Sequence, residues 1–163
     1  DTNVSLSNQI YIQAAKHKGT SGVEVLQNCV IFNDGIHDVV ADKEVRDERT
    51  IVLKHGEPMI FGKGSDKGLI LDGLKLKVVS LGENGITEKN ILIHDANESN
   101  PGIQYMLANM MYPEYPVALG VIRSVEAPTY EVAVAEQIRE VQKTARIKSI
   151  DDLLHSGSIW EVE

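Results

Sequence analysis

A ten-residue apolar run that stops at a turn signal constrains this chain more than any other feature. The run extends from Val23 to Phe32, is rich in β-branched residues, and ends abruptly at Asn33-Asp34-Gly35. A short run of this kind, closed by residues typical of turns, predicts a β-strand that is covered on both faces. The sequence therefore predicts a buried strand over residues 23–32.

The residues before this run have the spacing of an amphipathic helix. Leu6, Ile10, Ala14 and Ala15 recur at roughly helical intervals, and the pattern ends at Lys16-His17-Lys18-Gly19. Glycine commonly marks the end of a helix. A helix, a glycine and a buried strand in this order are typical of the second half of a βαβ unit. We therefore expect an α/β fold at the amino end, with a further strand before the helix.

Cys29 is the only cysteine in the chain and lies inside the apolar run. It cannot form a disulfide within the chain, and it cannot complete a metal site by itself. The residues alone favour a buried, inert thiol. A catalytic thiol would need a neighbouring histidine, and a metal-bound thiolate would need ligands from outside the chain. A strand end beside a turn could leave the sulfur accessible for such a role.

Residues 34–126 are dense in glycine and predict a set of short strands. The expected strands are Thr50–Lys54, Met59–Phe61, Leu69–Leu71 and Leu74–Leu81, and Ile91–His94 is another short apolar run. Pro101 suits the first turn of a helix, which is expected to continue to Met111 because its apolar residues share one face. His94-Asp95 could form an oriented base, but such pairs in loops are more often structural.

Residues 127–163 carry the clearest helical pattern. A helix is expected to start at Pro128, and its apolar stripe consists of Val134, Ile138, Val141 and Ala145. On its outer side, Glu136 with Arg139 and Glu140 with Lys143 are expected to pair. Ser149 is expected to cap a short second helix, with Asp152 completing a variant capping box and Gly157 ending the helix. The narrow stripe indicates docking onto a larger body, or else it completes the core of this chain.

Composition and charge exclude several classes of function. The chain is 42% hydrophobic and 25% charged, as in globular proteins. Its formal net charge of −8 argues against nucleic-acid binding, which needs a clustered basic face. No apolar stretch reaches the length of a membrane span, and no signal peptide opens the chain. A single cysteine fits a reducing compartment, so we expect a cytoplasmic protein without nucleic-acid or membrane partners.

Several blocks of the sequence, in their order along the chain, carry a family resemblance. They are His17-Lys18-Gly19-Thr20-Ser21, Val25-Leu26-Gln27-Asn28-Cys29-Val30-Ile31-Phe32-Asn33-Asp34, His94-Asp95-Ala96, Asn100-Pro101, Tyr115-Pro116-Val117-Ala118-Leu119-Gly120-Val121, Val125-Glu126-Ala127-Pro128-Thr129-Tyr130, Leu153-Leu154-His155-Ser156-Gly157 and Trp160. Together they cover nearly the whole chain. They resemble the carboxyl-terminal part of the β subunits of 2-oxoacid:ferredoxin oxidoreductases. The Gln27-Asn28-Cys29 block and the long middle section are most similar to the 2-oxoglutarate branch.

The resemblance implies which cofactor residues the chain has and which it lacks. In the family, a Gly-Asp-Gly-Asp motif and a downstream asparagine hold the magnesium of thiamine diphosphate, and a Cys-x-x-Cys pair with a third cysteine binds a [4Fe-4S] cluster. None of these motifs is in this sequence. The resemblance implies that Cys29 is the fourth cluster ligand. Asn33 and Asp34 could line the cofactor or cluster pocket, although an Asn-Asp-Gly turn needs no function to explain it.

The fold expected from these observations is α/β at the amino end, followed by a mixed β-rich arm and a helical tail. The resemblance places the end of a thiamine-diphosphate-binding domain at residues 1–33, the arm at residues 34–126 and the tail at residues 127–163. It implies an enzyme that uses thiamine diphosphate, Mg²⁺ and a [4Fe-4S] cluster to convert a 2-oxoacid and coenzyme A to an acyl-CoA, passing electrons to ferredoxin.

An α subunit is the partner that the family implies. Because the cofactor-binding motifs are absent, the chain is expected to be inactive alone. The alternative, from a different class, is a non-catalytic assembly module whose helical tail binds a partner subunit.

Overall fold

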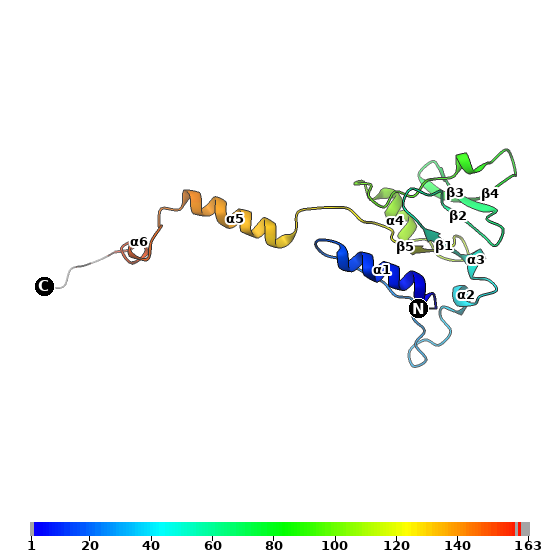
Figure 1. Cartoon of the computed structure of the whole chain (residues 1–163), viewed down its shortest axis with the longest axis horizontal. Helices are drawn as coiled ribbons and strands as arrows, with labels where there is room; N and C mark the ends of the chain where they lie inside the picture. Colours follow the sequence, from blue (N-terminus) through cyan, green and yellow to red (C-terminus); the bar gives the residue numbers. More distant parts are fainter. Residues whose placement is uncertain (1, 159, 161–163) are drawn as a thin grey trace. The chain divides into compact units, whose positions relative to one another are not determined.

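The structure is a computed structural model that describes residues 2–158 and 160. The chain divides into two compact units, which are described separately below (Figure 1). The first unit comprises Asp1–His17 and Ser21–Glu126, and the second comprises Lys18–Thr20 and Ala127–Glu163. The domain division suggested by the sequence stays a prediction.

An antiparallel sheet forms one part of the first unit. Its strands are β2 (Ile60–Phe61), β3 (Lys67–Asp72) and β4 (Lys75–Ser80), in the order β2-β3-β4. The hairpin between β3 and β4 pairs Asp72 with Lys75 across a two-residue turn, and Gly73 in that turn has a φ of +64°. A positive φ at this point is typical of the tight turns that suit twisted hairpins.

A second, parallel sheet consists of only two strands. β1 (Thr50–Leu53) pairs in parallel with β5 (Val117–Gly120), so that Leu53 lies opposite Gly120. The long connection between them contains the antiparallel sheet, the short helix η1 (Glu88–Asn90) and the helix α4 (Gly102–Ala108). The first unit is therefore a mixed α/β structure with one small parallel and one small antiparallel sheet.

The core of the first unit lies where these elements meet. Its buried apolar residues are Ile51, Leu53, Met59, Phe61, Leu69, Leu76, Ile91, Leu107 and Met110.

The four strands predicted over residues 50–81 and the helix predicted after Pro101 are confirmed. The run Ile91–His94 is not a strand, because among the described residues its single bridge joins Ile93 to Pro58. Its backbone is nevertheless held, since Leu92 donates to the Leu69 carbonyl at 2.9 Å.

The strand predicted over residues 23–32 is wrong. The helix before it is confirmed as α1 (Val4–Lys16), but the apolar run itself is irregular. Val30, Ile31 and Phe32 are 74%, 83% and 89% exposed. A strand needs a neighbour whose N–H and C=O groups face its own. Within the described residues, the run has only a single bridge, from Cys29 to Asn33, so it has no sheet to join.

The segment after the run contains two short helices. α2 (Asp38–Ala41) buries Val40, and α3 (Arg46–Arg49) leads directly into β1. The guanidinium of Arg49 donates to the Val39 carbonyl at 2.8 Å and lies 4.8 Å from the ring centroid of Tyr112. These contacts hold the segment that follows the apolar run against the residues around Tyr112.

The second unit contains the two predicted helices. α5 (Tyr130–Thr144) begins two residues after Pro128, and α6 (Ile150–Leu154) has Ser149 as its N-cap. The predicted capping box is confirmed, since the Ser149 hydroxyl accepts from the Asp152 N–H at 3.0 Å and the Asp152 side chain accepts from the Ser149 N–H. Glu140 and Lys143 form the expected ion pair. No residue of either helix is buried.

Candidate functional site: the loop around Cys29

The three residues singled out from the sequence lie in one compact loop, residues 28–35. The backbone N–H of Asn33 donates to the carbonyl of Cys29 at 2.9 Å and closes the tip of the loop. Asn28 closes its base, because its side-chain amide donates to Oδ1 of Asp34 and its oxygen accepts from the N–H of Gly35, both at 2.8 Å. Cys29, Asn33 and Asp34 are thus brought together by local hydrogen bonds.

The thiol of Cys29 is exposed, not buried as the residues alone suggested. Backbone N–H groups of Phe32 and, second, of Ile31 donate to the sulfur and lower the pKa of the thiol, while partial desolvation opposes them. Hydrogen bonds to the charged form favour that form, so this loop stabilises a thiolate. A thiolate is the form that binds iron or acts as a nucleophile.

The loop alone does not provide a complete metal site. Across residues 2–158 and 160, no three His, Cys, Asp or Glu side chains are grouped so that they could hold a metal ion. Oδ1 of Asp34 accepts a hydrogen bond from the side-chain amide of Asn28. The backbone N–H of Asn33 donates to the carbonyl of Cys29. What the geometry offers is one accessible thiol, with a lowered pKa, on a defined loop.

Sequence reasoning overlooked the structural role of Asn28. The sequence does contain a pattern that could have indicated this role. An asparagine six residues before an Asp-Gly pair can form hydrogen bonds with both the carboxylate and the glycine N–H. Gly35 has a φ of +76°, which other residues rarely adopt. An asparagine at one end and a glycine at the other therefore define this loop.

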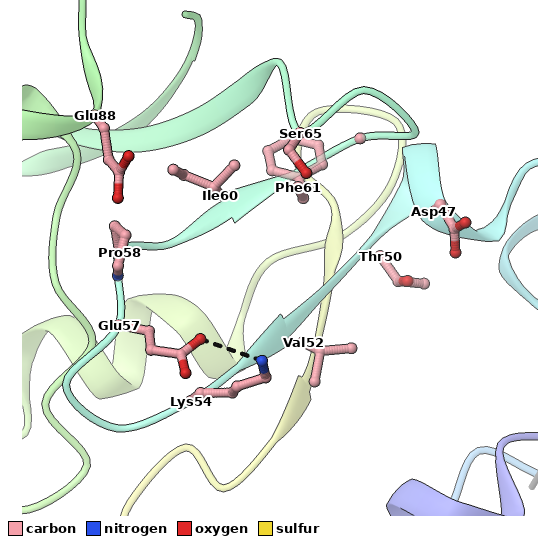
Figure 2. Close-up of a pocket in the computed structure, with 11 residues that line it drawn as sticks. Asp47, Thr50, Val52, Lys54, Glu57, Pro58, Ile60, Phe61, Ser65 and Glu88 are labelled. Atoms are coloured by element: carbon pink, nitrogen blue, oxygen red, sulfur yellow. Dashed lines mark ion pairs between the residues drawn. The ribbon is translucent and has the colours of Figure 1, made fainter.

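A second candidate is a pocket of about 640 Å³ on the first unit, drawn in Figure 2. It lies on the side of β1 that faces away from the core, where Thr50, Val52 and Lys54 point, and Ile60 and Phe61 of β2 form another wall. Its charged lining residues are Asp47, Lys54, Glu57 and Glu88. Lys54 pairs with Glu57 at 3.2 Å. The pocket contains none of the residues of the Cys29 loop.

The pair His94-Asp95 does not form an oriented base. His94 is buried and its Nε2 lies 2.9 Å from the Val121 carbonyl oxygen. The carboxylate of Asp95 lies 3.4 Å from Nδ1 of His55 instead. Nearby, buried Gln104 donates to three backbone carbonyls, those of Asp95, Ala96 and Glu98. These contacts hold loops together, which supports the structural interpretation of the pair.

The sequence is related to a known oxidoreductase subunit. It is 33% identical over 153 residues to the 2-oxoglutarate oxidoreductase subunit KorB of Mycobacterium tuberculosis. The aligned region covers 92% of this chain but only 40% of the length of that relative. The match agrees with the resemblance found in the sequence. No family model matches the chain, and no solved structure matches it.

Within the described part of the chain, no helix is both long and apolar enough to cross a membrane.

Proposed function

We propose that this chain is part of the β subunit of a 2-oxoacid:ferredoxin oxidoreductase, with 2-oxoglutarate as the 2-oxoacid. The observation that carries this proposal is the 33% identity to a 2-oxoglutarate oxidoreductase subunit across 92% of the chain. The order of the sequence blocks supports the same assignment. Because the chain spans 40% of that relative and lacks the family's cofactor motifs, it is inactive alone.

In this proposal Cys29 supplies one thiolate to a [4Fe-4S] cluster. The residues fit the role, because the sulfur is exposed and receives two backbone N–H groups that favour a thiolate. Backbone hydrogen bonds to cluster sulfurs are among the features that set the reduction potential of such clusters. The cluster, when bound, carries the electrons on to ferredoxin. The other three thiolates come from outside this sequence, since Cys29 is its only cysteine.

Thiamine diphosphate and Mg²⁺ are held, in this proposal, by the part of the subunit that this sequence does not contain. Thiamine diphosphate supplies the carbanion stabilisation that decarboxylation of a 2-oxoacid requires. Asn33 and Asp34 contribute to the lining of the cofactor or cluster pocket. The partners are an α subunit, ferredoxin, coenzyme A and the 2-oxoacid, and the enzyme works in the cytoplasm.

The second candidate function is a non-catalytic assembly module. The observation that favours it is the helical second unit, in which neither α5 nor α6 buries a residue. Amphipathic helices without a buried face are typical of segments that bind a partner.

A reconstitution experiment distinguishes the two functions. The chain is mixed with an α subunit and with the remaining part of a β subunit, and 2-oxoglutarate- and coenzyme A-dependent reduction of ferredoxin is measured. Activity that requires all three components supports the enzyme assignment. Binding to the other components without activity, and without any effect of thiamine diphosphate on binding, supports the assembly module. A Cys29→Ser chain serves as the control, because it should still bind but should not restore electron transfer.

A further inference from the structure

The pocket drawn in Figure 2 is a cleft between two strands that belong to different sheets. β1 pairs with β5 and β2 pairs with β3, so no ladder of hydrogen bonds joins β1 to β2 in the described residues. The cleft is closed at its two ends. The N–H of Glu57 donates to the Lys54 carbonyl at 3.1 Å at one end, and the N–H of Gly62 donates to the Asp47 carbonyl at 3.0 Å at the other. Backbone hydrogen bonds therefore hold both ends of the cleft in place.

The middle of the cleft is apolar. It is lined by Val52, Pro58 and Ile60, and Val52 is 42% exposed although it belongs to β1. Thr50, Val52 and Lys54 follow one another on one side of the chain, over about 13 Å at about 3.3 Å per residue. A cleft of about 640 Å³ with an apolar middle and a few polar groups has the size and character of a small-molecule site.

Carboxylates lie at both ends of this apolar middle. Figure 2 shows Asp47 at the end nearest the start of β1, and Glu57 and Glu88 at the other end, on either side of Pro58. The carboxylate of Glu57 is paired, because it lies 3.2 Å from Nζ of Lys54. The carboxylate of Glu88 takes part in no hydrogen bond or ion pair within the described part of the chain. Glu88 is therefore free to bind a cation at this end.

The carboxylate of Asp47 is available at the opposite end. Its Oδ1 lies 3.9 Å from Nε of Arg46, and the side chain is 63% exposed, so this attraction is weak. The cleft then has three carboxylates and one ammonium, that of Lys54, which already pairs with Glu57. An anion would be repelled by this lining. A ligand with an ammonium at each end and an apolar chain between them matches both the charges and the apolar middle.

We propose that this cleft binds a linear aliphatic diamine or polyamine. One terminal ammonium pairs with Asp47 and the other with Glu88, and the methylene groups between them cover Val52 and Ile60. The inference does not depend on the proposed enzymatic function. Because both carboxylates are in contact with water, the affinity should be modest and should fall as added salt screens the charges.

An NMR titration of the whole chain at low ionic strength tests the ligand class, with putrescine, cadaverine and spermidine as probes. The backbone amide signals of Val52 and Ile60 should shift and reach saturation. Butylamine and pentylamine are the matched controls, because each keeps the carbon chain of one diamine but has a single ammonium. We expect each diamine to bind about fivefold more tightly than its matched monoamine. Equal affinities, or no saturable shift with any of the three probes, would overturn the proposal.

Three substitutions that each remove one negative charge test the site. Asp47→Asn and Glu88→Gln remove the carboxylates at the two ends, and each should lower the affinity for spermidine by about fivefold without changing the circular dichroism spectrum. Glu136→Gln, on α5 in the second unit, changes the net charge equally and is the matched control. It should leave the affinity unchanged. An equal loss in all three variants, or no loss in Asp47→Asn and Glu88→Gln, would show that amines do not bind through this cleft.

Discussion

The side chain of Asn28 links both sides of the Cys29 loop, donating to Oδ1 of Asp34 and accepting from the N–H of Gly35, each at 2.8 Å. The residue beside the thiol therefore also ties the loop together. Within this loop, backbone hydrogen bonds from Phe32 and, second, from Ile31 lower the pKa of the Cys29 thiol. A flexible exposed loop would present the same thiol without these fixed donors.

The reactivity of Cys29 should show the effect of these donors. We expect its rate of alkylation by iodoacetamide to reach half-maximum at a pH below that of a free cysteine, because the N–H groups of Phe32 and Ile31 lower the pKa of the thiol. Phe32→Pro removes the first of these donors and should raise the midpoint. Phe32→Ala keeps the N–H and should leave the midpoint unchanged. Equal midpoints for the two variants would show that the donors do not act on the sulfur.

The local patterns in the sequence predicted the local elements well. The helix α5, the capping box at Ser149 and the strand β4 all depend on neighbours in sequence, and each of them is present. The predicted stripe of α5 was too long by one residue, because the helix ends at Thr144 and Ala145 has an extended backbone. β5 was missed, because Val117–Gly120 is short and its pairing with β1 spans a long connection. Its strand character depends on a partner that no local pattern reveals.

The apolar run over residues 23–32 shows where a local sequence pattern fails to predict the structure. Its composition has strong β propensity, yet propensity for strands reflects packing against neighbours. In the described residues no strand runs beside it, and Phe32 is 89% exposed. For the same reason the sequence could not decide between a buried and an accessible Cys29. The sequence pointed to Cys29, Asn33 and Asp34 through a family resemblance, whereas the hydrogen bonds of Asn28 became visible only in three dimensions.

Gly120 should be intolerant of substitution. It has a φ of +106°, and a Cβ atom at this position would lie 2.6 Å from the carbonyl oxygen of Leu53 on the paired strand. Gly120→Ala should lower the free energy of unfolding by roughly 2–4 kcal/mol, from backbone strain and steric overlap. Gly56→Ala is the matched control, since Gly56 also has a positive φ but open space around it. Its cost should be about 1–2 kcal/mol. Urea unfolding measures both, and equal losses would contradict the close approach of β1 and β5.

Gln104 should be important for the loops that surround His94. Its buried side-chain nitrogen donates to the carbonyls of Asp95, Ala96 and Glu98, and its oxygen accepts from Arg123. Gln104→Met keeps the volume but removes these bonds. The Asp95 carbonyl loses this donor, whereas the carbonyls of Ala96 and Glu98 keep donors from the Ser124 N–H and from Arg123, so we expect a loss of about 1–3 kcal/mol in the free energy of unfolding. Gln13→Met, on an exposed position of α1, should change it by less than about 0.5 kcal/mol. A neutral result for Gln104→Met in thermal unfolding would mean that water replaces these hydrogen bonds.

The assignment of Cys29 as a cluster ligand is tested most directly in an intact β subunit that carries Cys29→Ser. The measurement is the iron and acid-labile sulfide content of the purified protein, together with the paramagnetic signal of its reduced state. Val30→Ala, which keeps the thiol and both N–H donors, is the control and should retain the cluster. We predict that Cys29→Ser weakens or abolishes cluster incorporation, because one of four thiolates is lost. Unchanged iron and sulfide with a normal reduced-state signal would contradict the account.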